Sequence, residues 1–322
     1  MEAARSKDGT TIAFDRSGEG PPVVLIGGAL DDRVAAFELS AALAPRHTVI
    51  AFDRRGRGDS ENTPPYSVDR EVEDIEAVIV AAGGRAHVFG HSSGAVLALE
   101  TARALPERVT SLALYEPPFI VDDSRPPLPT DHVTRLERLV SAGRRGDAVE
   151  YFLSTGPRVP PEVVAGMRGG PFWPSLESVA HTLAYDGTIM GDTMGGSPDP
   201  LRRWASVKAP TLVMDGGASP GWQRNAVRTL VAVLPGARRR TLEARGTGRT
   251  RRSWHARWRR SSAIDPPPHV RRRRPPVGQP SARQRSLTSR RMIANRDGSD
   301  VGTPGRGTEA DGSQAQSASR PG

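Results

Sequence analysis

The chain has 322 residues, no cysteine and a formal net charge of +9. The lack of cysteine excludes disulfides, thiol nucleophiles and cysteine metal sites. The charge is unevenly distributed, because residues 1–243 carry 27 basic and 31 acidic side chains, whereas the remaining 79 residues carry 18 arginines, no lysine and 5 acidic side chains. The two parts therefore need separate interpretation.

No apolar leader follows Met1, and no run of residues approaches the ~18 apolar positions that a membrane span requires. These features predict a cytoplasmic protein without a membrane partner. We also expect no cofactor and no metal.

Short apolar runs alternate with helical patterns through residues 1–243. This alternation predicts an α/β fold with a mostly parallel, twisted sheet flanked by helices. In chain order the pattern predicts a hairpin ending in strand 10–14, strands 23–26 and 47–52, a helix from Ser67 to Gly83, strand 86–89, helix 94–105, strand 109–115, strand 211–214 with a helix after it, and strand 238–242.

Residues 121–200 break the alternation with helical stretches near 131–142, 147–153 and 175–185. We interpret them as an inserted helical cap over a core built from residues 1–120 and 201–243, with a plain helical excursion as the alternative. Residues 244–322 are rich in arginine and proline and too poor in large apolar residues to form a core, so we expect a disordered tail.

The motif that carries chemistry is Gly-His-Ser-Ser-Gly at positions 90–94. A GxSxG sequence between a strand and a helix places its serine on a sharp turn, with the hydroxyl above the sheet. The motif alone is weak in a chain rich in Gly and Ser, but a buried run precedes it and a helical pattern follows it. We predict that Ser92 is a nucleophile, with an ordinary strand-to-helix turn as the alternative.

An acyl-transfer site also needs backbone N–H groups directed at the developing oxyanion. Ser93 follows the nucleophile and would supply one of them. The loop Gly27-Gly28-Ala29 follows the third strand, and Ala29 is the expected second donor. A plain glycine turn is the alternative for this loop.

Four features in order resemble the α/β-hydrolase superfamily over about residues 5–243. They are the Gly27-Gly28 loop, the Asp-Arg-Arg-Gly-Arg-Gly-Asp-Ser turn at 53–60, the elbow at Ser92, and the strand and turn at 210–217. The resemblance implies an α/β-hydrolase fold and a serine hydrolase of the esterase type. It further implies an ester or a similar small acyl molecule as substrate, and a structural role for the turn at 53–60.

The acid of the expected triad departs from the family pattern. The resemblance implies an Asp a few residues beyond strand 211–214, but the corresponding position here is Ser219. Two carboxylates could replace it, Glu116 at the end of the preceding strand and Asp215 four residues earlier. The alternative for each is a structural pairing with an arginine or with backbone amides.

The base is the second departure, because the family places a histidine after strand 238–242 and none stands there. The nearest downstream histidine, His255, lies among arginines that would disfavour an imidazolium. His91 lies inside the elbow, and the other histidines are interpreted as ordinary scaffold, cap or tail residues. Activity is therefore expected to be impaired, and a non-catalytic hydrolase-like protein is the alternative function.

An abrupt change in composition at Ala244 suggests a cause. Arginine-rich, lysine-free sequence with many prolines and glycines is what a GC-rich gene yields when it is read out of frame. If the codons GCC AGG GGC ACG GG encode residues 244–248, one added G gives Gly-Gln-Gly-His-Gly, which contains a histidine. We hypothesise a frameshifted C-terminus, and we expect the edge of strand 211–214 to lose its partner.

A basic tail could instead bind nucleic acid, because arginines at 271–274 could contact phosphates and Trp254 and Trp258 could stack on bases. No fold or ordered motif supports that function. A small acyl substrate is the expected partner, and nucleic acid is not.

Overall fold

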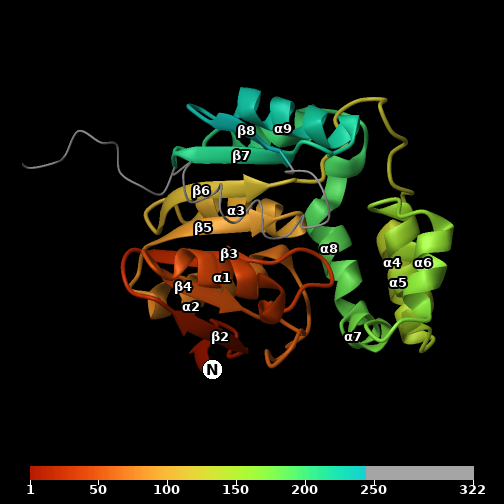
Figure 1. Cartoon of the computed structure of the whole chain (residues 1–322), viewed down its shortest axis with the longest axis horizontal. Helices are drawn as coiled ribbons and strands as arrows, with labels where there is room; N and C mark the ends of the chain where they lie inside the picture. The colour runs from red at the N-terminus through yellow and green to blue at the C-terminus, as the bar shows by residue number, and fades with distance from the viewer. Residues whose placement is uncertain (244–322) are drawn as a thin grey trace, which may run out of the picture. The chain divides into compact units, whose positions relative to one another are not determined.

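The computed structural model of the protein describes residues 1–243. Within them, eight strands form one sheet in the order β1-β2-β4-β3-β5-β6-β7-β8 (Figure 1). β1 pairs with β2 and β2 with β4 in antiparallel fashion, and all other neighbours are parallel. The strands are β1 (Glu2–Arg5), β2 (Thr11–Ser17), β3 (Pro22–Ile26), β4 (Thr48–Phe52), β5 (Ala86–His91), β6 (Val109–Tyr115), β7 (Thr211–Gly216) and β8 (Arg238–Leu242). The predicted α/β-hydrolase fold with a mostly parallel sheet is confirmed.

Helices cover both faces of this sheet. The helices of the described residues are α1 (Phe37–Leu43), α2 (Val68–Ala81), α3 (Ser93–Ala104), α4 (His132–Ser141), α5 (Arg145–Thr155), α6 (Pro161–Arg168), α7 (Trp173–Ser178), α8 (Leu183–Met190) and α9 (Gly221–Val233). Apolar residues of α2, α3 and α9 pack on one face of the sheet, and those of α1 pack on the other. The sheet thus lies between two helical layers. Ligand sites in such sheets lie just outside the carboxyl ends of the parallel strands.

The helix α2 shows how the sequence determines these elements. Ser67 accepts a hydrogen bond from the Arg70 N–H at 3.3 Å, and Asp69 and Glu71 lie in the positive first turn. Ile75 and Ile79 recur on one face and are fully buried against the sheet. The predicted helix after Ser67 is confirmed.

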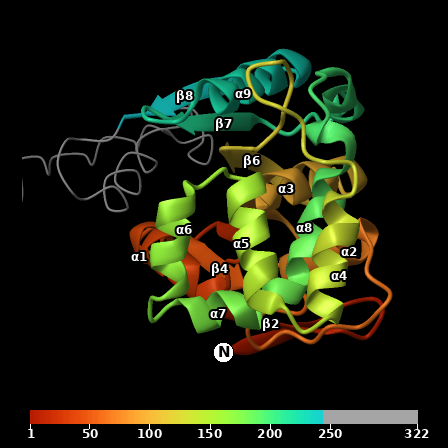
Figure 2. The same cartoon turned by 90° about the vertical axis from the view of Figure 1, so that its right-hand side faces the viewer.

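The segment 121–200 contains more helix than the sequence indicates. The helix α6 lies in a stretch that we expected to be a loop, and it begins with Pro161, whose fixed φ and missing N–H suit a first helical position. The expected stretch 175–185 is divided into α7 and α8 by a 3-10 turn at Ala180–Thr182. Figure 2 shows α4, α5 and α6 side by side in front of the sheet, and their buried apolar residues form a separate cluster.

The expected loss of strand pairing beside 211–214 is wrong. β8 pairs with β7 in parallel register from Leu212 opposite Arg238 to Gly216 opposite Leu242, so this edge of β7 is covered. The expected disordered tail, the nucleic-acid alternative and His255 lie outside the described residues. No helix within residues 1–243 is long and apolar enough to cross a membrane.

Candidate active site

The turn between β5 and α3 holds Ser92 in a strained conformation, with φ of 54° and ψ of −123°. A non-glycine residue adopts such a positive φ only where its surroundings enforce it. The flanking glycines show the cause. A Cβ on Gly90 would lie 2.4 Å from the Gly94 carbonyl oxygen, and a Cβ on Gly94 would lie 2.4 Å from that of Ile26. The motif glycines thus permit the close approach that makes the elbow.

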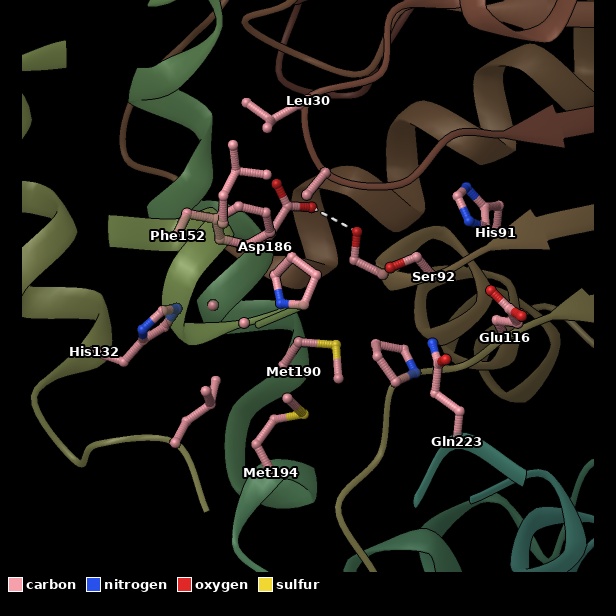
Figure 3. Close-up of a pocket in the computed structure, with 18 of the residues that line it drawn as sticks. Leu30, His91, Ser92, Glu116, His132, Phe152, Asp186, Met190, Met194 and Gln223 are labelled. Carbon is pink, nitrogen blue, oxygen red and sulfur yellow. Dashed lines mark hydrogen bonds between the residues drawn. The ribbon is translucent and has the colours of Figure 1, made fainter. Parts of the chain in front are cut away.

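Ser92 faces a cavity of about 310 Å³ that is lined mostly by apolar side chains. In Figure 3, Ser92 lies between Glu116 on one side and Asp186 on the other, and Met190, Met194 and Phe152 line the space beyond. Both expected oxyanion donors, Ala29 and Ser93, also line this cavity. The cavity therefore brings together Ser92, Glu116, Ala29 and Ser93, four of the five residues predicted from the sequence.

The loop after β3 lies directly against the elbow, since a Cβ on Gly28 would be 3.1 Å from the Ser92 Cβ. Ser93 is the first residue of α3, where a backbone N–H has no acceptor within the helix. The Ala29 N–H likewise has no acceptor among residues 1–243. Both residues line the cavity, and neither N–H has an acceptor that the structure describes.

Glu116 lies at the end of β6 with a positive φ of 48°, and it lines the cavity. Its Oε1 accepts two hydrogen bonds, one from the Ser219 hydroxyl and one from the Gly216 N–H at 3.3 Å. Ser219 occupies the position where the family pattern implies the acid. The structure therefore places the Glu116 carboxylate beside that position.

Asp215 is placed differently. It is fully buried, and its Oδ2 accepts hydrogen bonds from Arg239 Nε and Nη2 at 3.1 and 2.6 Å. It does not line the cavity that holds Ser92. The arrangement matches the structural pairing that we considered as the alternative for this residue.

Two histidines of the described chain, His91 and His132, line the cavity. His91 Nδ1 lies 3.5 Å from Asp31 Oδ2. His132 Nδ1 lies 3.2 Å from the Tyr151 hydroxyl, and burial lowers the pKa of His132. Among residues 1–243, neither histidine is hydrogen-bonded to Ser92. The described residues thus supply no imidazole that is hydrogen-bonded to the serine.

A buried charge network lies beneath the elbow, and sequence reasoning missed it. Asp186 of α8 accepts hydrogen bonds from Arg54, Arg57 and Ser93, each at 2.7 Å. Glu71 of α2 accepts two bonds from Arg54 at 2.8 and 2.7 Å. The turn at 53–60, expected to be structural, supplies the two arginines. The three arginines of this turn are all buried in the structure. Three arginines in so short a turn were a signal that carboxylates lie nearby, but not of which ones.

The described residues contain no group of three or more His, Asp or Glu side chains arranged to hold a metal ion.

Comparison with known proteins identifies the family of the chain. A model of the Alpha/beta hydrolase family matches residues 23–263. The crystal structure of an alpha/beta hydrolase from Sphaerobacter thermophilus is 53% identical, with a TM-score of 0.74, and the match covers 79% of this chain and 97% of that one.

Curated relatives are also hydrolases. The 2-(acetamidomethylene)succinate hydrolase of Mesorhizobium japonicum is 26% identical over 216 residues, which are 65% of this chain and 75% of the relative. A protein of Azorhizobium caulinodans, provisionally named carbamate hydrolase RutD, is 37% identical over 105 residues. This match covers 32% of the chain and only 40% of the relative's length. On these matches, the fold and the family model, the chain belongs to the alpha/beta hydrolase family.

Proposed function

We propose that this protein is a serine hydrolase of the esterase type that acts on an ester or a similar small acyl substrate. Ser92 attacks the carbonyl carbon, and the Ala29 and Ser93 N–H groups bind the oxyanion that forms. The observation that carries the proposal is the strained φ of 54° at Ser92 together with its exposure to a cavity that also holds both donors.

Glu116 is the proposed acid of the site, in preference to Asp215. Its contact with Ser219 supports this role, because that serine stands where the family pattern implies the acid. Asp215 already pairs with Arg239 and lies outside the cavity lining. A carboxylate in this place would orient an imidazole and stabilise its protonated form.

The segment 121–200 is the proposed cap. It contributes Leu128, Phe152, Met190 and Met194 to the cavity wall. The cavity-lining residues within 1–243 include no lysine or arginine, and most of them offer apolar contact to a substrate. A small, uncharged acyl group fits this lining best.

A non-catalytic hydrolase-like protein is the second candidate. It is favoured by one observation, which is that no histidine within residues 1–243 is hydrogen-bonded to Ser92. Loss of one triad member leaves roughly 10³- to 10⁴-fold acceleration over water in serine proteases, from the oxyanion hole and substrate binding. Weak turnover is therefore the expected activity of this chain.

Labelling with a fluorophosphonate distinguishes the two candidates. We expect stoichiometric labelling of the folded protein at Ser92, located by peptide mass spectrometry. Ser92→Ala should abolish the label, whereas Ser141→Ala, at an exposed serine on α4, should leave it intact. A folded protein that takes up no label at Ser92 would refute the proposed activity and support the non-catalytic candidate.

A further inference from the structure

The network around Asp186 connects three separate segments to the elbow. Asp186 belongs to α8, and its side chain is 2% exposed. Its Oδ1 accepts hydrogen bonds from Arg54 Nη1 and from the Ser93 hydroxyl. The dashed line at Asp186 in Figure 3 marks the hydrogen bond from Ser93. Its Oδ2 accepts a bond from Arg57 Nη2. One carboxylate thus ties α8 to the turn after β4 and to the first residue of α3.

Arg57 extends this connection to the loop after β3. Its Nη1 donates to the Gly28 carbonyl oxygen at 2.5 Å, and its Nε donates to the Thr182 hydroxyl at 3.0 Å. The Gly28 carbonyl and the Ala29 N–H belong to the same planar, trans peptide unit, so the N–H points away from the carbonyl. An arginine that holds the carbonyl therefore also fixes the direction of the Ala29 N–H.

The charges of the network balance, because two arginines face two carboxylates, Glu71 and Asp186. Burial alone would raise the pKa of Asp186, but the charges of Arg57 and Arg54 outweigh it and hold that pKa below its usual value. Asp186 is thus ionised, and its bonds are charge-assisted. A charged donor on the Gly28 carbonyl also polarises the peptide, which makes the Ala29 N–H a stronger donor.

We propose that Asp186 and Arg57 are positioning residues for the oxyanion hole, aligning the Ala29 and Ser93 N–H groups on one point above Ser92. The inference rests on the proposed function of Ser92. Both residues act through backbone donors and not on the reacting atoms. Because Asp186 belongs to the segment that walls the cavity, that segment also sets the geometry of the chemical step.

The test uses Asp186→Asn and Arg57→Lys in the full chain. Asp186→Asn removes the carboxylate charge, and Arg57→Lys keeps the positive charge but loses the fork that bridges Asp186 and Gly28. The matched control is Asp74→Asn, since Asp74 is also buried and accepts two bonds of 2.7 Å from an arginine of the same turn, but lies outside the cavity lining. Circular dichroism checks that each variant is folded.

The readout is fluorophosphonate labelling at Ser92, measured over a range of probe concentrations. Removal of one oxyanion donor typically costs ~10²- to 10³-fold, so misalignment should lower the maximal labelling rate by at least ~10-fold. The half-saturating concentration should change by less than ~3-fold, because ground-state binding does not use these donors. Asp74→Asn should leave both values unchanged.

Ser93→Ala keeps the test valid if the charged variants fail to fold. It removes one bond to Asp186 and no charge, and it should slow labelling about fivefold, the worth of one hydrogen bond. Wild-type rates in folded Asp186→Asn, Arg57→Lys or Ser93→Ala would overturn this inference alone, as would an equal loss in Asp74→Asn. A wild-type chain that is not labelled at all would overturn the proposed function and this inference with it.

Discussion

Replacement of Gly94 by alanine probes the contact between the elbow and the strand β3. A Cβ at this position would lie 2.4 Å from the Ile26 carbonyl oxygen and 2.5 Å from that of Gly27. Ordinary contact begins at 3.4 Å, so α3 and β3 would have to separate by about 1 Å. Both carbonyls are backbone groups, and no side-chain rotation can relieve the clash.

The expected cost follows from this displacement. Overpacking of a buried site costs about 1–3 kcal/mol, and the better helix propensity of alanine returns about 0.5–1 kcal/mol. From the middle of each range, we expect Gly94→Ala to lower the free energy of unfolding by about 1 kcal/mol, and by about 2.5 kcal/mol at most. A shift of about 1 Å between Ser92 and the loop that carries Ala29 should also slow labelling on the order of 10²-fold.

Urea unfolding followed by tryptophan fluorescence measures the first effect, and the fluorophosphonate rate measures the second. Gly166→Ala is the matched control, because Gly166 lies within α6 and a Cβ there meets nothing within 4 Å. That variant should gain about 0.5–1 kcal/mol and label at the wild-type rate. A Gly94→Ala protein with wild-type stability and labelling would show that the close approach is not what shapes the elbow.

Three further predictions concern the base, the acid and the pH dependence of stability. Addition of one nucleotide after the codon of Glu243, to restore a histidine to the following loop, should raise ester hydrolysis at least ~10²-fold, and an unchanged rate would count against the frameshift hypothesis. In that restored protein Glu116→Gln should remove most of the gain and Asp215→Asn should not; the reverse result would reassign the acid. Burial lowers the pKa of His87 and His132, so the unfolded chain binds protons more readily than the folded protein. The urea concentration at half-unfolding should therefore decrease when the pH is lowered from 7 to 5. An equal midpoint at both values would contradict this.

The fold was readable from the sequence because its determinants are local. Period-two and period-3.6 patterns define strands and helices, and Gly90 and Gly94 mark the elbow at a fixed spacing. The same logic failed for α6, where a proline and a glycine within the segment suggested a loop. Pro161 starts that helix and Gly166 is tolerated in it, because packing of the buried Val164 outweighs weak local propensity.

The site was only partly readable because its remaining contacts are tertiary. The bond between Glu116 and Ser219 spans 103 positions, and that between Arg57 and Asp186 spans 129. Sequence spacing gives no information about such pairs. It therefore left both Glu116 and Asp215 as candidates. Only the arrangement of β6 and β7 directs the Glu116 carboxylate to the cavity and leaves Asp215 with Arg239.

An exposed, strained serine and a base to activate it are separate requirements of catalysis, and a pH profile can distinguish them. The strained Ser92 and the proposed oxyanion donors depend on packing within residues 1–243, so they should persist without a base. A hydrogen-bonded imidazole makes the labelling rate rise to a plateau above its own pKa, near 6.5. Without one, the serine must lose its proton to solvent, and the rate should climb steadily from pH 6 to pH 9. A plateau near neutrality in the present chain would show that a base does reach Ser92.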